Sequence, residues 1–272
     1  MIEALAPILG RHDATALAGG DICRAFRVRT DRGTFFAKTP RRPDPHMLVV
    51  EAEGLRRIGA VVPGLTPRVV HADPQWLVLE WIEPSPPTRA AARSLGRRLA
   101  SLHRSSPGPF GDGPEQGRIG SVAMPAGQFG SWPQMYAELR LRPLLTADLP
   151  ACAELVGVLS EGPDWAGPSE PPSLLHGDLW AGNVIWCPEP GLVDPACHVG
   201  HRETDLAMLA LFGAPHLEDV LRAYDEAFPL SAGWQERTGL HQLWPLLVHH
   251  RLFGAGYGAR AEQIATGYLR AA

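Results

Sequence analysis

The turn at residues 174–186, LLHGDLWAGNVIW, constrains this sequence more than any other segment. Between two apolar runs it places His176, Asp178, Trp180 and Asn183. Glycine and aspartate are common in turns that only connect strands, but such turns seldom need all of these residue types together. The segment is therefore either a connecting turn with polar tips or an active-site turn between two short strands. The rest of the sequence decides between them.

The first quarter of the chain is typical of a small β-sheet with one helix. Residues 24–30 and 33–39 alternate around a turn and predict a hairpin, and a glycine pair before them is placed to end an earlier strand. Residues 46–59 have the apolar spacing of a helix. Residues 69–83 predict two more strands around an Asp-Pro turn. Together these elements predict a β-rich lobe that ends near Glu83.

From residue 84 onward the pattern changes from strands to helices. A proline-rich stretch at 84–88 suits a connector between lobes. The next helix places Leu95, Leu99 and Leu102 on one face. The expected segments are a helix at 89–104, a long surface loop at 106–131, helices at 132–146 and 151–161, a hairpin built on the 174–186 turn, and a mostly helical remainder after Glu203.

Composition excludes several classes of function. The 272 residues are 45% hydrophobic and 20% charged, with a formal net charge of −4, as in ordinary soluble proteins. Without a basic block we expect no nucleic-acid surface, and no apolar run reaches the roughly 20 residues that cross a bilayer. The four cysteines form no C-x-x-C pair, so we expect reduced thiols in a cytoplasmic protein. We expect a monomer, with a dimer as the alternative.

Asp178 and Asn183 have the spacing of a phosphotransfer loop, H-G-D-x-x-x-x-N. Protein kinases carry H-R-D-x-x-x-x-N, in which the Asp accepts the proton of the substrate hydroxyl and the Asn binds Mg²⁺. Asp194 ends an apolar stretch where kinases have the Asp of D-F-G, and one carboxylate with one amide carbonyl is a normal ligand set for Mg²⁺. Asp178 is therefore the candidate catalytic base, and Asn183 and Asp194 are the candidate metal ligands. For Asp194, an ordinary Asp-Pro turn is the alternative.

Lys38 ends the apolar run FFAK, as the phosphate-binding lysine of a kinase strand does. Such a lysine needs a carboxylate partner, and the next helix offers two. Glu51 shares the apolar helical stripe that includes Leu48 and Leu55, while Glu53 points away from it. A carboxylate on the buried face of a helix is costly unless it is paired. We therefore expect Lys38 to pair with Glu51 and Glu53 to be solvated. The alternative for Lys38 is an exposed lysine at a strand end.

Two further segments complete a nucleotide site. Gly19 and Gly20 lie ahead of Lys38 between expected strands, where their backbone N–H groups can approach the phosphates of ATP. A plain turn is the alternative for this pair. The segment LVLEWIE is placed as the hinge between the lobes, with the backbone of Glu80 and Ile82 available to adenine.

The order of these features predicts the fold. Glycine loop, lysine, helical glutamate, hinge, catalytic loop and strand-end aspartate follow one another as a bilobal kinase requires. We therefore expect an α+β, protein-kinase-like fold that uses ATP and Mg²⁺. Its small β-rich lobe, residues 1–83, would bind ATP, and its larger, mainly helical lobe, residues 84–272, would hold the catalytic groups and the substrate.

The segment after Asp194 indicates a small acceptor. Protein kinases place an activation segment and an A-P-E motif there to order a peptide, but here PACHVGH passes into RETDLAM within eight residues. Because Pro195 fixes φ and removes a backbone donor, we expect no flip of this segment. Asp205 either braces the catalytic loop from the following helix or is only an acidic residue favoured by the helix dipole.

Several stretches resemble the fructosamine kinase (ketosamine-3-kinase) family, and the similarity covers nearly the whole chain. The most specific is H-G-D-L-W-x-G-N, because Trp after D-L separates this family from aminoglycoside and choline kinases. FFAKT, EAEGLRRI, LVLEWIE, DPACHVGHRETDLAMLALFG and LFGAGY also match. The resemblance implies ATP-dependent phosphorylation of a sugar 3-hydroxyl in a ketosamine, free or protein-bound, after which the adduct releases its amine.

The resemblance also implies roles for single residues. It agrees with the base and metal ligands given above, and it sets Lys38 with Glu51 on the α- and β-phosphates. Trp180 would face the ketosamine, and a hydrophobic lid of the loop is the alternative. His176 would be a structural hydrogen-bonding residue of the catalytic loop rather than an acid or base.

Two departures from the family pattern are present. The family run P-Q-P-N-x-W is replaced by SVAMPAGQFGSWPQMY, which keeps Trp132 as a candidate substrate contact. Cys23 lies in the glycine-loop region but is offset from the cysteine that several members use in redox control. A redox role for Cys23 is therefore only a hypothesis, which a Cys23→Ser variant with unchanged oxidant sensitivity would refute.

Two other functions remain open from the sequence. One is a different small-molecule kinase, acting on an aminoglycoside, choline or homoserine, although no acidic cluster late in the chain suits an aminoglycoside. The other is a nucleotide-binding pseudokinase, against which the retained Lys38, Asp178, Asn183 and Asp194 argue.

Overall fold

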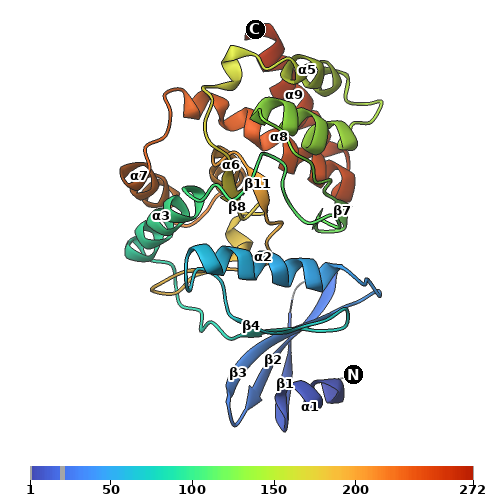
Figure 1. Cartoon of the computed structure of the whole chain (residues 1–272), viewed down its shortest axis with the longest axis vertical. Helices are drawn as coiled ribbons and strands as arrows, with labels where there is room; N and C mark the ends of the chain where they lie inside the picture. The colour runs from blue at the N-terminus through green and yellow to red at the C-terminus, as the bar shows by residue number, and fades with distance from the viewer. Residues whose placement is uncertain (1, 19–21, 272) are drawn as a thin grey trace.

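Five strands make the small lobe, which lies in the lower part of Figure 1. The computed structural model describes residues 2–18 and 22–271, and within them the sheet is antiparallel with the order β1-β2-β3-β5-β4. The strands are β1 (His12–Leu17), β2 (Cys23–Thr30), β3 (Gly33–Pro40), β4 (Val69–Ala72) and β5 (Leu77–Glu80). The predicted hairpin, the strand before it and the two strands after it are therefore confirmed.

Helices build most of the large lobe (Figure 1). The α-helices are α1 (Ala6–Leu9) and α2 (Met47–Val61) in the small lobe, then α3 (Arg89–His103), α4 (Trp132–Met135), α5 (Pro150–Ser160), α6 (Glu203–Phe212), α7 (Leu217–Ala227), α8 (Trp234–Phe253) and α9 (Ala255–Ala271). A π-helical segment (Tyr136–Leu141) and the 3₁₀ turns Ile2–Leu5, Arg142–Leu144, Asp164–Ala166 and Ala181–Asn183 complete them. The α+β architecture is confirmed, and the helix expected at 132–146 is α4 continued by π and 3₁₀ turns.

Side-chain alternation along β3 gives each face of the sheet its own partner. Phe35 and Ala37 face the apolar cluster formed with α1. Phe36 and Lys38 therefore face the opposite side, which α2 covers. The strand period alone thus directs Lys38 toward the helix that carries Glu51.

The two lobes share an apolar core on one side of their junction. Ile58 on α2 belongs to the same buried cluster as Leu95 and Leu99 of α3, and the side chains of Leu95, Leu99 and Leu102 are buried as predicted. α3 begins just past the connector, where the Thr88 side chain caps it by accepting a hydrogen bond from the Ala91 amide at 3.1 Å. The division into lobes at residue 83 stays a prediction, although the connector does lie between β5 and α3.

The strands beside the 174–186 turn exist, but they do not pair with each other. β8 (Ser173–Leu175) pairs with β11 (His198–Gly200), and β9 (Val184–Ile185) pairs with β10 (Gly191–Leu192). The hairpin that the sequence predicted at this turn is therefore wrong. Its 3₁₀ turn separates the two strands, so each finds a later partner. The turn and the segment around Asp194 consequently lie between two small strand pairs.

The loop expected at 106–131 contains a short hairpin of β6 (Arg118–Ile119) and β7 (Val122–Ala123). The four cysteines are free thiols, as predicted. Across residues 2–18 and 22–271, no helix combines the length and apolar character that crossing a bilayer requires.

Candidate active site

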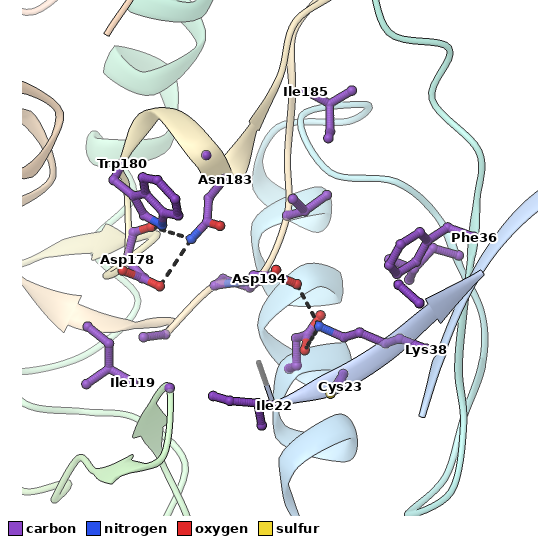
Figure 2. A pocket seen from close by; sticks show the side chains of 18 of the residues that line it. Ile22, Cys23, Phe36, Lys38, Ile119, Asp178, Trp180, Asn183, Ile185 and Asp194 are labelled. Carbon is purple, nitrogen blue, oxygen red and sulfur yellow. Dashed lines mark hydrogen bonds and ion pairs between the residues drawn. The ribbon is translucent and has the colours of Figure 1, made fainter. Parts of the chain in front are cut away.

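A cleft of about 650 Å³ lies between the lobes. Figure 2 shows Lys38 reaching into it from β3 while Asp178, Asn183 and Asp194 face it from the large lobe. The predicted site residues that line it are Lys38, Glu51, Glu80, Ile82, Asp178, Trp180, Asn183 and Asp194. The predicted glycine pair, Gly19 and Gly20, lies outside the residues that the structure describes.

Lys38 is held between two carboxylates from different lobes. Its Nζ lies 2.6 Å from Glu51 Oε2 and 2.7 Å from Asp194 Oδ1. The pairing with Glu51 that helix phase predicts is confirmed, and Glu53 is exposed as expected. Burial alone would lower the pKa of Lys38, but Asp194 and Glu51 outweigh it and raise that pKa. Burial, with Asp194 adding to it, favours a raised pKa for Glu51, and the ammonium of Lys38 at 2.6 Å opposes that shift.

Asp194 points into the cleft from a left-handed backbone conformation, with φ at 55°. Residues other than glycine seldom adopt this conformation, and such strain is found mainly at functional sites. Enclosure in the cleft would raise the pKa of Asp194, but Lys38 outweighs that effect and lowers it. The carboxylate is therefore ionised at neutral pH. Sequence reasoning did not foresee that it would share the ammonium of Lys38 with Glu51.

Asn183 and Asp178 are joined within the catalytic loop. Asn183 Nδ2 donates to the backbone carbonyl of Asp178 at 2.8 Å and to Asp178 Oδ2 at 3.1 Å, as the dashed lines in Figure 2 show. With its nitrogen committed, Asn183 offers Oδ1 to a cation. Burial raises the pKa of Asp178 to about 7, with Asn183 opposing and Asp194 adding to the shift. A carboxyl group that titrates near neutral pH is suited to accept a proton.

Asp205 braces the catalytic loop from the first turn of α6. Its buried carboxylate accepts hydrogen bonds from the backbone N–H groups of His176 at 2.7 Å and Gly177 at 2.9 Å. His103 Nε2 donates to the same carboxylate at 3.1 Å. His176 Nε2 in turn donates to the carbonyl of Val193 at 2.9 Å, which ties the loop to the residue between β10 and Asp194. These contacts are the ones that the bracing interpretation of Asp205 and a structural role of His176 predict, and they favour both.

Gly177 lets two segments of the site approach each other closely. Its φ is +82°, and a Cβ at this position would lie 2.1 Å from the carbonyl oxygen of Ala196. Any side chain would both strain the backbone and push this oxygen away. The glycine of H-G-D therefore sets the separation between the catalytic loop and the segment that follows Asp194.

The hinge segment presents backbone and apolar groups to the far end of the cleft. The Glu80 N–H donates to the carbonyl of Arg68 at 3.0 Å, so the Glu80 carbonyl is the backbone group left for adenine. Phe36 and Ile185 line the cavity near it, with their side chains visible in Figure 2. Apolar walls of this kind suit a flat aromatic base. The adenine contacts of Glu80 and Ile82 stay predictions.

Trp180 stands beside Asp178 with 42% of its surface exposed. Its indole covers Gly182, where a Cβ would lie 2.2 Å from the ring. A lid packed down on the loop would be largely buried, whereas this ring lines the cleft. The geometry thus favours the ligand-facing interpretation of Trp180 over the lid.

Trp132 lies in the core of the large lobe, so its predicted substrate contact is wrong. Its side chain is 4% exposed and is not among the described residues that line the cleft. The indole stacks on Tyr136 and His241, with ring centroids 5.0 and 4.3 Å away. The physical reason is that Trp132 opens α4, and α4 belongs to the apolar cluster that α8 also builds.

A second group of ligand-type side chains lies beneath Trp132. His201, Glu203 and His241 offer ligand atoms within 4.8 Å of one another. However, both oxygens of Glu203 accept hydrogen bonds from Arg237, at 2.6 and 3.0 Å. The guanidinium group of Arg237 therefore already provides the positive charge that a metal would supply. The cluster of His201, Glu203 and His241 is explained as part of a buried ion-pair network.

Sequence reasoning missed two segments that reach the cleft. Arg118, Ile119 and Gly120 come from the small hairpin in the predicted loop, and His249 and Phe253 come from the end of α8. The i, i+4 spacing of His249 and Phe253 shows in the sequence that they share a helix face. Their sequence gave no sign that this face would meet residues of the catalytic loop.

Cys23 lines the cleft at the start of β2. Burial raises the pKa of its thiol, while Lys38 opposes the shift. A raised pKa reduces the fraction of thiolate, which is the form that reacts with oxidants. The raised pKa therefore does not favour the redox role of Cys23, which stays a hypothesis.

Comparisons of the sequence with known proteins agree with one another. Residues 3–271 match the family model described as fructosamine kinase. A probable ketoamine kinase of Thermus thermophilus is 36% identical over 260 residues, which cover 94% of this chain and 92% of that protein. A chloroplastic protein-ribulosamine 3-kinase of Arabidopsis thaliana is 32% identical over 94% of this chain and 82% of its own length.

Solved structures agree on the fold. A crystal structure assigned as a fructosamine-3-kinase, from Thermobifida fusca, superposes with a TM-score of 0.89 at 37% identity and covers 98% of both chains. A thermostable mutant of an aminoglycoside phosphotransferase, in complex with AMP-PNP and hygromycin B, superposes with a TM-score of 0.65 at 16% identity over 97% of both chains. The second similarity is evidence of the fold alone, and it confirms the kinase-like architecture.

Proposed function

The chain belongs to the fructosamine kinase family, and on that premise we propose that it transfers the γ-phosphoryl group of ATP to the 3-hydroxyl of a ketosamine. One observation carries the proposal. Lys38 reaches from the small lobe to Asp194, while Asp178 and Asn183 face the same cleft from the catalytic loop. Phosphoryl transfer needs this arrangement of one cation, one base and two oxygen ligands around a triphosphate.

The residues present fit a bound Mg²⁺. Magnesium prefers hard oxygen ligands, and the hydrogen bonds of Asn183 Nδ2 leave its carbonyl oxygen for that purpose. Asp194 supplies an ionised carboxylate whose side chain is 51% exposed toward the cleft. Asn183 and Asp194 would therefore hold the ion, and its charge would offset that of the phosphates.

Asp178 is the group that would receive a proton. The acceptor hydroxyl attacks the γ-phosphorus, a new O–P bond forms as the bond to ADP breaks, and Asp178 takes the hydroxyl proton. Its pKa of about 7 leaves a large fraction ionised at neutral pH. Lys38 would bind phosphate oxygens while Glu51 fixes its position. Most of the rate enhancement would come from orientation and electrostatic complementarity.

A direct assay tests the proposal. Purified protein with ATP and Mg²⁺ is given ribulosyl and fructosyl adducts of an N-acetyl-lysine amide, and ³¹P NMR follows the product. We expect a sugar phosphate ester at the 3-position. We expect Asp178→Asn to lower kcat by roughly 10²–10⁴-fold with ATP binding retained. Turnover of the variant near that of the wild type would reject Asp178 as base, and phosphorylation of choline or an aminoglycoside in place of both adducts would reject the proposed acceptor.

A further inference from the structure

Aromatic rings form a continuous surface that leads outward from the catalytic loop. Trp180 meets Phe212 edge to face, with centroids 6.3 Å apart. Phe212 lies 4.8 Å from His249, and His249 lies 5.5 Å from Phe253 and 5.1 Å from Tyr257. We call Phe212, His249, Phe253 and Tyr257 the aromatic shelf, with Trp180 at its inner end.

The shelf is continuous with the catalytic cavity and open to solvent. Trp180, His249 and Phe253 line the same cavity as Asp178. Phe253 is 64% exposed and Phe212 is 38% exposed. Large apolar side chains exposed together beside a functional cleft usually mark a binding surface. The ends of α6 and α8 and the start of α9 supply these rings, so a packed scaffold holds them in place.

Few carboxylates line the cleft into which the shelf leads. The carboxylates among the described residues lining the cleft are Glu51, Glu80, Asp178 and Asp194. Glu51 and Asp194 are bound to Lys38, and Glu80 lies at the hinge. Asp178 is then the carboxylate left to face an acceptor. A polycationic acceptor would need several carboxylates here, whereas an uncharged chain needs none.

We propose that the aromatic shelf is the subsite for the alkyl arm of the amine that carries the sugar. The enzyme would then prefer ketosamines whose amine bears a long alkyl chain with no charge at its far end. This inference rests on the proposed function. With the 3-hydroxyl at Asp178, the secondary ammonium group of the adduct lies near the indole of Trp180, where an aromatic face attracts a cation. The methylene groups beyond it then run over Phe212, His249 and Phe253 and lose contact with water.

His249 is the centre of the shelf and is fixed in orientation. A carbonyl oxygen can only accept a hydrogen bond, so Nδ1 of His249 is the donor to the carbonyl of Pro245, at 2.7 Å. The ring therefore stays aligned against Phe212, Phe253 and Tyr257. A preformed surface of this kind binds an arm without first having to be ordered.

Arm length gives the decisive measurement. We compare ribulosyl adducts of methylamine, butylamine and hexylamine, which share the sugar and the ammonium group and differ only in methylene groups. For the wild type we expect KM to fall about tenfold from methylamine to butylamine, with kcat nearly constant. For Phe253→Ala we expect this dependence on length to shrink to less than about threefold, while the methylamine adduct and ATP keep their KM values. Phe253→Leu, which keeps apolar area, should restore most of it.

A matched control separates the shelf from general effects of surface truncation. Val49→Ala also removes an exposed apolar side chain, but Val49 lies on α2 and does not line the cleft. It should leave the length dependence unchanged. If Phe253→Ala keeps the full length dependence, or raises KM equally for all three adducts, the shelf is not the arm subsite although the proposed function stands. If no adduct is phosphorylated, both the shelf and the proposed function fall.

Discussion

Lys38 is the only lysine in the 272-residue sequence, so all other permanently charged side-chain cations are arginines. The site explains the exception. Two carboxylates approach the ammonium group from different lobes, at 2.6 and 2.7 Å, and a compact point charge with three donors can serve both. A planar guanidinium group favours side-on binding to one carboxylate. Composition therefore marks this position more clearly than the apolar run before it.

Asp178 should make the folded protein less stable as the pH rises. Its pKa is raised to about 7 by burial, whereas an unfolded chain keeps it near 4. Below about pH 4 the group is protonated in both states and costs nothing. Between about pH 4 and 7 the unfolded state loses the proton first, so the stability of the folded protein falls as the pH rises. Above about pH 7 both states are ionised, and stability falls no further from this group. An amide at this position cannot ionise.

We therefore expect Asp178→Asn to melt higher than the wild type at pH 8, by on the order of 3 °C or more. The gap should shrink steadily as the pH falls toward 4.5. Thermal unfolding of both proteins without nucleotide, at half-unit steps of pH, measures it. A gap that stays constant over this range would contradict the raised pKa, and the same titration of a Glu53→Gln variant, at an exposed position, supplies the baseline.

At the scale of elements, local periodicity predicted the parts of the site that local geometry determines. The strand period of β3 and the helical phase of α2 were enough to pair Lys38 with Glu51 rather than Glu53. Periodicity says nothing about which distant elements meet. Whether Trp132 would point to the cleft or to the core depended on how α4 packs with α8, and the sequence alone did not contain that packing.

The same limit applies to the strands around the catalytic turn. β8 and β9 were predicted as strands, but their partners, β11 and β10, come from the segment after the turn. A pairing between neighbouring strands is the simplest expectation from sequence. Here the segment from Asp178 to Asn183 ends in the 3₁₀ turn Ala181–Asn183, and β8 and β9 do not pair with each other. The residues of the motif were therefore predictable, whereas the pairing that supports them was not.

The brace under the loop gives a prediction for α6 as an element. Asp205→Asn replaces one acceptor oxygen with an amide NH₂ group. Because the His176 and Gly177 N–H groups donate to different oxygens of Asp205, the NH₂ group then faces one of these backbone donors. We expect a loss of about 1–3 kcal/mol in unfolding free energy, and a fall in kcat of about 10–100-fold because the loop shifts. Urea unfolding and steady-state kinetics measure the two effects.

Glu218→Gln on α7 is the matched control for Asp205→Asn. Glu218 also lies in the first turn of a helix, but its side chain is exposed. It shares with Asp205 only the attraction between a negative charge and the helix N-terminus, worth about 0.3–1 kcal/mol. If Asp205→Asn loses no more stability than this control and keeps its kcat, the hydrogen bonds to the loop are not what positions Asp178.

At the scale of the whole molecule, charged pairs join the two lobes at separate points. Lys38 meets Asp194 at 2.7 Å, and Arg57 on α2 meets Asp112 of the large lobe at 2.7 Å. Arg118 of the small hairpin, which lines the cleft, is paired with the carboxylate of Asp44, which lies just before α2. These contacts hold the lobes together around a cavity whose inner cation is buried, so access to Lys38 reports on the opening of the lobes.

Acylation of Lys38 should therefore be slow in the folded protein and fast after unfolding. A buried ammonium with a raised pKa offers almost no free amine to the reagent. Acylation of a lysine blocks tryptic cleavage after it. Because the chain has no other lysine, cleavage after residue 38 measures acylation at this one site. Arg97→Lys on the exposed side of α3 supplies an internal reference in the same molecule.

We expect position 38 to react at least about 100-fold more slowly than position 97, because reaction requires an opened minor state. ATP with Mg²⁺ should slow it further, and 0.5 M salt, which screens the pairs across the cleft, should speed it. Equal rates at the two positions in the folded protein would mean that the lobes do not close over Lys38, and the convergence on which the phosphotransfer mechanism depends would be lost.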